Sequence, residues 1–286
     1  MNKAMGLLAV DVDGTLITDH GIITDEVYNA LEKAHKLNWE IIIASGRTFP
    51  AAKTIVEKLP FIKYAIMSNG ACTVDMRDMS INHAEMLSPD TVKEVIGHAR
   101  GCGAVPALYD LSVENQHVYY DTLEGVCEYF EHYLNTDPRC TLVENIEHYS
   151  ENILQVSTVA KKEIIITLQK ALAGIGATVM VLPYETPRLG GKSDEFWFIQ
   201  IVNTNVKKHI ALRRMHDLLE IPAGRYVAAG DNYNDCDMLE DADVGVAMGN
   251  APDDVKAHAD VVVSSNNHSG LAQVVDEIIT DGKYFP

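Results

Sequence analysis

The chain has 286 residues, 47% of them hydrophobic, and its 41 acidic against 23 basic residues give a net charge of −18. This length suffices for one large or two ordinary globular domains. The strong negative charge argues against nucleic acid as a partner. The N-terminal segment has no apolar stretch suited to a signal peptide, and no run approaches the roughly 20 residues of a membrane span. The sequence therefore predicts a cytoplasmic protein without a membrane partner.

The first predicted strand covers Leu7–Val10, a short apolar run typical of a parallel sheet that is covered on both faces. Asp11 and Asp13 follow this strand directly, and Gly14 comes next. In open α/β sheets, ligands bind outside the carboxyl ends of the strands. The two aspartates are therefore candidate site residues, although Asp13-Gly14 alone is also a common turn sequence.

The same pattern of an apolar strand followed by small, polar or acidic residues recurs three times. The strand ends are Ser45–Arg47 after residues 41–43, Ser68–Gly70 after residues 64–67, and Gly230–Asp231 after residues 226–229. Amphipathic helices alternate with these strands, and Thr24 is placed to cap the first of them. This alternation predicts an α/β fold with a Rossmann-like parallel sheet and helices on both of its faces. Because the strand ends meet at one sheet edge, they indicate a single site.

The middle of the chain differs, because none of its strand-like runs ends in clustered acids. Ser88 and Pro89 are typical of a helix start, and Gly101 of its end. We predict an inserted α+β domain over residues 84–190, with residues 1–83 and 191–286 forming the core and the chain re-entering it near 196–205. The segment 185–197, with Arg188, Lys192 and a pair of glycines, is a candidate for lying near the site. Its alternative interpretation is a solvated loop between strands.

The strand ends bring together residue types suited to phosphate chemistry. Four carboxylates at one edge raise each other's pKa values and destabilise a fold unless a cation neutralises them. Ligands that are all oxygen favour Mg²⁺, which shares its coordination with waters and a substrate phosphate. An aspartate nucleophile with a second carboxylate as proton donor is a workable mechanism on phosphorus. The carboxylates are Asp11, Asp13, Asp231 and Asp235, and candidate phosphate donors are Ser45, the backbone at Gly46, Asn234 and a lysine.

Several stretches resemble the motifs of the haloacid dehalogenase superfamily. They are "DVDGTL" at 11–16, "SGR" at 45–47, a lysine at 207 or 208 and "GDNYNDCDML" at 230–239. "SNGA" at 68–71, "VGVAMGNA" at 244–251 and the position of the insert are similar to the subclass with a type IIB cap, the Cof-like sugar-phosphate phosphatases. The resemblance implies a Mg²⁺-dependent phosphatase for a small phosphorylated metabolite, working as a monomer or weak homodimer.

The resemblance also implies a role for each matching residue. Asp11 would be the nucleophile that forms an aspartyl-phosphate, and Asp13 the general acid and base. The implied Mg²⁺ ligands are Asp11, the backbone carbonyl of Asp13, Asp231 and Asp235, and the implied phosphate ligands are Ser45, Gly46, Asn234 and Lys208. Arg47 is expected either to reach the substrate or the inserted domain, or to be a surface charge.

Two adjacent lysines compete for the phosphate site. At about 100° per residue, Lys208 lies on the same helical face as the apolar residues, whereas Lys207 is turned away from it. The apolar residues of that face are Ala211, Leu212, Met215, Leu218 and Leu219. We therefore expect Lys208 to hold the phosphate.

Two other functions stay open on the sequence alone: a phosphomannomutase-like mutase and a non-catalytic phosphosugar sensor. A mutase needs a second phosphate clamp of arginines, but the predicted inserted domain has only Arg100, Arg139 and Arg188, which are far apart in sequence. The pair Asp11 and Asp13 is intact, which disfavours a sensor.

Overall fold

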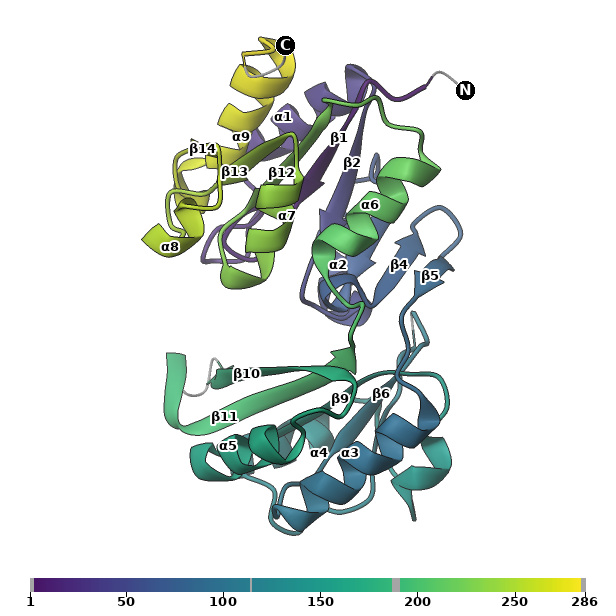
Figure 1. The fold of residues 1–286 in the computed structure, drawn as a ribbon. Coiled ribbons are helices and arrows are strands. Elements are labelled where there is room, and N and C mark those ends of the chain that lie inside the picture. The colour runs from purple at the N-terminus through teal and green to yellow at the C-terminus, as the bar shows by residue number, and fades with distance from the viewer. Residues whose placement is uncertain (1–2, 114, 187–190, 284–286) are drawn as a thin grey trace. The chain divides into compact units, whose positions relative to one another are not determined.

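The computed structural model describes residues 3–113, 115–186 and 191–283. The chain forms two compact units, residues 1–83 with 207–286 and residues 84–206, which are described separately below (Figure 1). Within the described ranges, no helix combines the length and apolar character needed to cross a membrane.

The first unit is built on an eight-stranded sheet with the order β14-β13-β12-β1-β2-β3-β4-β5. Its strands are β1 (Gly6–Val10), β2 (Trp39–Ala44), β3 (Tyr64–Met67), β4 (Cys72–Asp75), β5 (Ser80–Ala84), β12 (Tyr226–Gly230), β13 (Val244–Ala247) and β14 (Val261–Val262). Neighbouring strands from β14 to β3 run parallel, and β4 turns back antiparallel to β3. The carboxyl ends of β1, β2, β3 and β12 therefore lie at one edge of the sheet.

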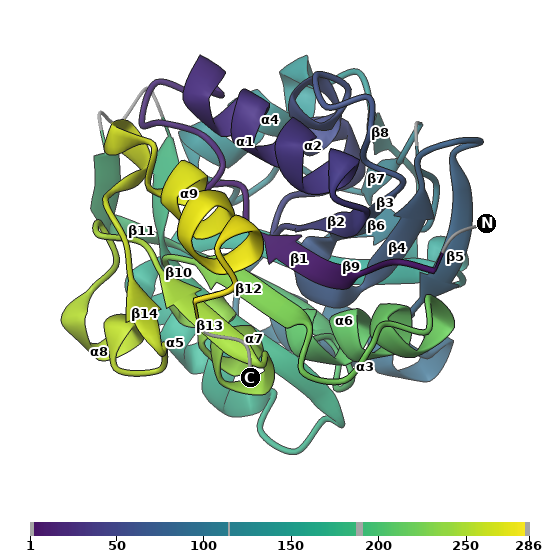
Figure 2. The same cartoon turned by 90° about the horizontal axis from the view of Figure 1, so that it is seen from above.

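Helices cover both faces of this sheet (Figure 2). One face carries α1 (Asp25–Lys36), α2 (Phe49–Val56) and α9 (Gly270–Gln273), which continues into a π-helix at Val274–Thr280; the other carries α6 (Lys208–Leu218) and α7 (Cys236–Asp241), and α8 is Asp253–Lys256. Thr24 caps α1 as expected, since its hydroxyl accepts a hydrogen bond from the Val27 backbone at 3.3 Å. This arrangement confirms the predicted Rossmann-like α/β core.

Strand β1, which precedes Asp11, is apolar along its whole length and is held in place by contacts on both of its faces. Successive side chains of a strand point to opposite faces, so a strand covered on both sides has to be apolar throughout. Leu7 and Ala9 pack in one core cluster with Leu212 and Met215 of α6. The strand that carries Asp11 at its end is thus fixed by buried contacts.

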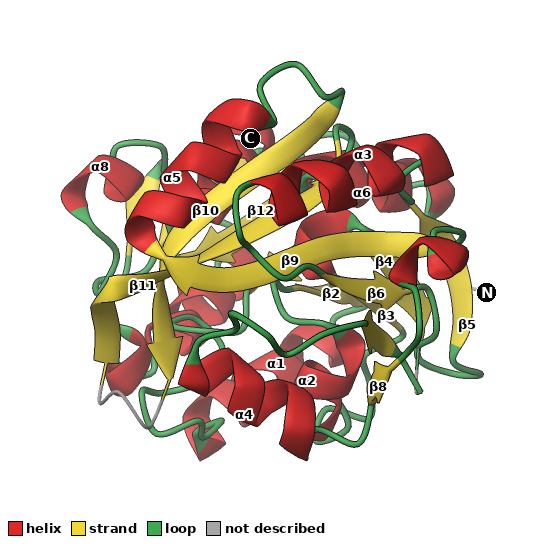
Figure 3. Cartoon of the chain, turned by 90° about the horizontal axis from the view of Figure 1, so that it is seen from below, coloured by secondary structure: helices red, strands yellow, loops and turns green. Residues whose placement is uncertain are grey.

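The second unit has a six-stranded sheet with the order β10-β11-β9-β6-β7-β8. Its elements are α3 (Pro89–Gly101), β6 (Ala107–Asp110), β7 (Val118–Tyr120), α4 (Glu128–Thr136), β8 (Cys140–Leu142), β9 (Ile153–Lys161), α5 (Lys162–Ala171), β10 (Ala177–Thr186) and β11 (Gly191–Asn203). Figure 3 shows α3 and α5 on one side of β9 and β6, and α4 on the other. Val156 and Ile199 pack with the first pair of helices, whereas Tyr109 and Tyr120 pack with α4.

The chain returns to the first unit later than predicted. β11 pairs antiparallel with both β10 and β9, with Ile199 opposite Thr158 and Ile201 opposite Val179. Residues 191–206, predicted as part of the core, therefore belong to the second unit, and re-entry occurs at Lys207, just after the predicted segment 196–205. The apolar stretch in β11 suits a buried strand of either sheet, so only its pairing partners decide where it belongs. Within the segment 185–197, residues 187–190, Arg188 among them, lie outside the described part of the chain.

Candidate active site

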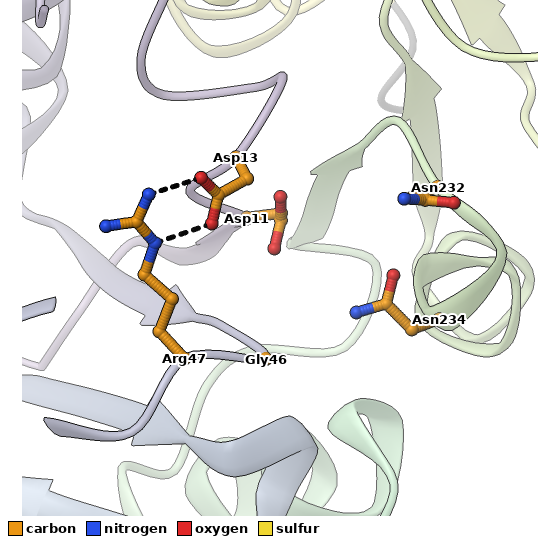
Figure 4. Close-up of a pocket in the computed structure, with 6 residues that line it drawn as sticks. All are labelled: Asp11, Asp13, Gly46, Arg47, Asn232 and Asn234. Atoms are coloured by element: carbon orange, nitrogen blue, oxygen red, sulfur yellow. Dashed lines mark hydrogen bonds and ion pairs between the residues drawn. The ribbon is translucent and has the colours of Figure 1, made fainter. Parts of the chain in front are cut away.

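Residues that follow three strands, β1, β2 and β12, line a pocket of about 260 Å³ in the first unit. The lining residues are Asp11, Asp13, Gly46, Arg47, Asn232 and Asn234 (Figure 4). Backbone hydrogen bonds continue the sheet into these ends: the Asp11 nitrogen donates to the Ala229 carbonyl at 3.0 Å, and the Ser45 nitrogen to the Ile66 carbonyl at 2.8 Å. The sheet thus sets the position of each polar segment.

A buried ammonium group links two of the predicted carboxylates. Lys208 Nζ donates to Asp11 Oδ1 at 2.5 Å and to Asp235 Oδ1 at 2.6 Å. Lys208 is only 2% exposed and is the first residue of α6. Burial alone would lower the pKa of Lys208, but the charges of Asp11 and Asp235 outweigh it and hold the pKa above its ordinary value. A fixed positive charge therefore lies beside Asp11 and Asp235.

The neighbouring Lys207 lies elsewhere. It precedes α6 with an extended backbone (φ −149°), and its Nζ donates to Asp237 at 2.8 Å on a half-exposed side chain. The helical projection selects the lysine that reaches the carboxylates, but it treats Lys207 as helical, which it is not. It also puts Leu218 on the buried face, whereas this side chain is 57% exposed near the end of the helix.

The carboxylates of Asp11, Asp231 and Asp235 form an acidic cluster, with one oxygen of each within 4.8 Å of the others. Burial raises the pKa of Asp11 to about 8 against the opposing charge of Lys208, and Asp235 adds to the rise. Burial also raises the pKa of Asp231 to about 6, again with a contribution from Asp235. Three carboxylates face a single ammonium group, so the positive charge of Lys208 does not balance the negative charge of the ionised cluster. Its oxygen-only donor set fits Mg²⁺.

The backbone at Gly14 makes room for this cluster. Gly14 has φ +77°, and a Cβ on it would lie 2.1 Å from Asp231 Oδ2. A side chain at position 14 would therefore displace the Asp231 carboxylate. Asp235 is fixed from the other side, because its Oδ2 accepts hydrogen bonds from the backbone nitrogens of Asp231 and Asn232, both at 3.0 Å.

Asp13 is not a member of the acidic cluster and is paired with Arg47 (Figure 4). Arg47 donates from Nε to Asp13 Oδ2 at 2.7 Å and from Nη2 to Asp13 Oδ1 at 2.5 Å. A third bond, from Nη1 to the Ala51 carbonyl at 3.2 Å, fixes the guanidinium group at the start of α2. The sequence left Arg47 open between a ligand contact and a surface charge. In this structure its partner is Asp13.

Only some of the predicted phosphate ligands are exposed to the pocket. Gly46 and Asn234 line it, whereas Ser45 is fully buried and is not among the lining residues. The Ser45 hydroxyl oxygen accepts a hydrogen bond from the Arg47 backbone nitrogen at 3.1 Å and keeps its own proton for another partner. Asn234 Nδ2 donates to the side-chain oxygen of Asn69 at 2.9 Å.

Two residues around Asp231 were missed by the sequence analysis. Thr15 Oγ1 donates to Asp231 Oδ1 at 3.2 Å, and Asn250 Nδ2 donates to Asp231 Oδ2 at 3.1 Å and to the Gly14 carbonyl at 2.9 Å. Both residues lie inside stretches that resemble family motifs. A sequence motif does not specify which of its side chains contacts a carboxylate that follows another strand. The contacts of Thr15 and Asn250 with Asp231 could therefore be identified only in the structure.

Comparisons with known proteins cover nearly the whole chain. A family model described as haloacid dehalogenase-like hydrolase matches residues 8–275. The 5-amino-6-(5-phospho-D-ribitylamino)uracil phosphatase YitU of Bacillus subtilis (strain 168) is 25% identical over 277 residues, covering 95% of this chain and 96% of the relative. The putative phosphatase YxeH of the same organism is 28% identical over 288 residues, covering 96% and 98%. The solved structure of the haloacid dehalogenase subclass IIB sugar phosphatase BT4131 shares the fold, with a TM-score of 0.72, 23% identity, and 97% and 99% coverage.

Proposed function

Because the chain belongs to the haloacid dehalogenase-like hydrolase family, we propose that it is a Mg²⁺-dependent phosphatase acting on a small phosphorylated metabolite such as a sugar phosphate. One observation carries the proposal. The buried Asp11 carboxylate, fixed by Lys208 and flanked by two further carboxylates, opens onto a pocket that also presents Gly46 and Asn234. Carboxylates, a fixed cation and hydrogen-bond donors at one pocket are the groups that phosphoryl transfer through an aspartate requires.

Asp11 is the nucleophile in this mechanism. One of its carboxylate oxygens bonds to phosphorus while the bond from phosphorus to the ester oxygen breaks, and the ester oxygen leaves with a proton from Asp13. A water oxygen then bonds to phosphorus, its proton passes to Asp13, and the bond from phosphorus to Asp11 breaks to release inorganic phosphate. Lys208 holds Asp11 in place through its Oδ1 contact and compensates part of the negative charge.

The acidic cluster would hold the metal ion. Asp11, Asp231 and Asp235 supply carboxylate oxygens, and the backbone carbonyl of Asp13 is the further ligand that the family motif implies. When bound, Mg²⁺ neutralises charge on the transferring phosphoryl group and on the carboxylates. Thr15 and Asn250 orient Asp231 by donating one hydrogen bond to each of its oxygens.

Asp13 needs one oxygen free for proton transfer, and both are bonded to Arg47 in this structure. The acid and base role therefore requires Asp13 to release at least one of these bonds. The guanidinium group is held independently by the Ala51 carbonyl, so it stays at the pocket wall when Asp13 moves. Arg47 is then placed to stabilise the Asp13 anion between proton transfers.

The charge partners in the second unit support hydrolysis over a mutase reaction. Arg100 pairs with Asp121 and with Glu147, and Arg139 pairs with Asp137 at 2.7 Å. Both guanidinium groups thus already have carboxylate partners. Among the described residues of the second unit, the charges of both arginines are therefore partly compensated already, which disfavours a second phosphate clamp.

The test is phosphate release from a panel of esters with Mg²⁺, with Mg²⁺ removed by chelation, and with Asp11→Asn as the inactive control. The panel includes hexose phosphates, p-nitrophenyl phosphate and 5-amino-6-(5-phospho-D-ribitylamino)uracil, the substrate in the name of the relative YitU. We expect Mg²⁺-dependent release from at least one ester without added bisphosphate. Isomerisation that needs a bisphosphate would favour a mutase, and binding without turnover of any ester would favour a sensor.

A further inference from the structure

The turn after β3 has an unusual backbone. Ser68, Asn69 and Gly70 have φ values of 51°, 58° and 105°, so three consecutive residues are in the left-handed region. Non-glycine residues are uncommon there, and asparagine tolerates it better than most. Such conformations persist where the surrounding contacts enforce them, and they concentrate at functional sites.

This turn joins two of the segments that build the pocket. The Ser68 nitrogen donates to the Arg47 carbonyl at 2.8 Å, and the Asn69 nitrogen donates to the Ser45 carbonyl at 2.9 Å. On its other side Gly70 packs on the residue before Lys208, since a Cβ on Gly70 would lie 2.5 Å from the Lys207 carbonyl oxygen. The strained backbone therefore ties residues 45–47 to the start of α6.

The side chain of Asn69 reaches a third segment. Its Oδ1 accepts the hydrogen bond from Asn234 Nδ2 at 2.9 Å. Both amides lie against Gly46, because a Cβ there would be 3.1 Å from Asn69 Oδ1 and 3.6 Å from Asn234 Nδ2. Figure 4 shows Asn234 with its nitrogen turned toward Gly46.

We propose that Asn69 is a positioning residue of the pocket, which acts by fixing the side-chain amide of Asn234. The two ends of an amide are nearly equal in size, so only a hydrogen-bond partner selects between them. The acceptor on Asn69 keeps the Asn234 nitrogen toward Gly46. That nitrogen has a second proton, which is available to an anion, whereas the amide oxygen in its place would repel one. The inference rests on the proposed function in that the anion is the phosphoryl group of the substrate.

The first test is Asn69→Gly, which keeps a residue suited to φ 58° and removes the amide. With p-nitrophenyl phosphate and Mg²⁺, we expect KM to rise about tenfold, the scale of one hydrogen bond to a charged group, while kcat changes less than about threefold. The dissociation constant of inorganic phosphate, measured by calorimetry, should rise by the same factor. A purely structural role would lower Tm and the active fraction without this split between KM and kcat.

Asn38→Gly is the matched control. Asn38 also has a left-handed backbone (φ 64°), and its side-chain nitrogen donates to the Lys3 carbonyl, away from the pocket. The same substitution there should leave KM, kcat and phosphate affinity unchanged.

The second test asks whether Asn69 works through Asn234. Asn234→Ala removes the donor without touching the strained turn, so it also serves if Asn69→Gly folds poorly. We expect Asn234→Ala to weaken phosphate binding at least as much as Asn69→Gly, and the double variant to be no worse than Asn234→Ala alone. Additive losses, or an unchanged phosphate affinity in Asn69→Gly or Asn234→Ala, would overturn the inference. If the wild-type protein hydrolyses no ester, the proposed function fails, and the phosphate titration still tests the role of Asn69.

Discussion

Asp11 and Asp13 are two residues apart in sequence, but their side chains differ in solvent exposure and in the basic residue that they contact. The side chain of Asp11 is 7% exposed and bonded to the buried Lys208, whereas that of Asp13 is 56% exposed and bonded to Arg47. A nucleophile benefits from a dry, fixed position because its reacting oxygen is then preorganised. A proton carrier benefits from contact with water, with which it exchanges protons. The two environments thus suit the different roles proposed for these identical side chains, Asp11 as nucleophile and Asp13 as proton carrier.

The largest effect is expected from Asp11→Asn, which keeps the shape of the buried carboxylate and removes its nucleophilic charge. The loss in kcat should be at least about 10⁴-fold, since removing a catalytic nucleophile has effects of this order. Steady-state assays of phosphate release measure it, and circular dichroism checks that the fold is intact. Activity within tenfold of the wild type would refute the covalent mechanism.

Asp13→Asn should cost about 10²–10⁴-fold in kcat on an alkyl phosphate, the range for lost general acid and base catalysis. The loss should be smaller on p-nitrophenyl phosphate, because nitrophenolate leaves without needing a proton. Parallel assays of both esters make the comparison. Equal losses would mean that Asp13 serves the structure or the metal ion and does not carry protons.

Lys208→Ala should reduce kcat/KM by at least about 10²-fold, because it removes the fixed cation beside Asp11. Lys207→Ala is the control, since Lys207 pairs with Asp237 and not with the acidic cluster. Its kcat/KM should stay within about threefold of the wild type. Kinetics of both variants in Mg²⁺ decide the assignment, and the reverse pattern would contradict it.

Arg47→Lys keeps the charge beside Asp13 but loses the paired geometry of the guanidinium group. We expect about a tenfold loss in kcat on an alkyl phosphate and a smaller loss on p-nitrophenyl phosphate, because a lysine cannot make the paired contacts that orient Asp13 as proton donor. Steady-state kinetics of both proteins on the two esters measure this. Equal losses on the two esters would show that Arg47 does not act through Asp13.

The smallest effect concerns stability and metal binding. Burial raises the pKa of Asp11 from 3.8 to about 8. Between about pH 4 and pH 8 the folded metal-free protein therefore holds a proton that the unfolded chain has lost, and its stability falls as pH rises. The proposed Mg²⁺ would replace this proton, so we expect Mg²⁺ binding to strengthen as pH rises over the same window. Thermal unfolding should show a larger Mg²⁺-dependent increase in Tm at about pH 8 than at about pH 6. The opposite trend would mean that Asp11 does not exchange its proton for the metal ion.

Local patterns were sufficient to predict much of the fold. The cap at Ser88, the first-turn Pro89 and the final Gly101 predict α3 with its observed ends, because these residues act within one helical turn. The end of the inserted unit depends on the pairing of β11 with β9, which joins residues about 40 positions apart in sequence. Apolar composition does not contain that information.

In the candidate site too, the sequence predicts some features and not others. Asp11, Asp231 and Asp235 could be grouped in advance because each follows a strand that ends at the same sheet edge. The pairing of Arg47 with Asp13 and that of Asn69 with Asn234 are contacts between long or turned side chains. Their partners depend on rotamers and on a left-handed backbone, which residue spacing alone does not specify.

The close approach of Gly14 to Asp231 has a consequence for comparing sequences. A related chain could retain every aspartate of the acidic cluster and still be catalytically silent, if a larger residue at position 14 pushed the carboxylate of residue 231 aside. Surveys that sort active from inactive relatives by their acidic residues alone would miscount such chains, and position 14 offers the correction.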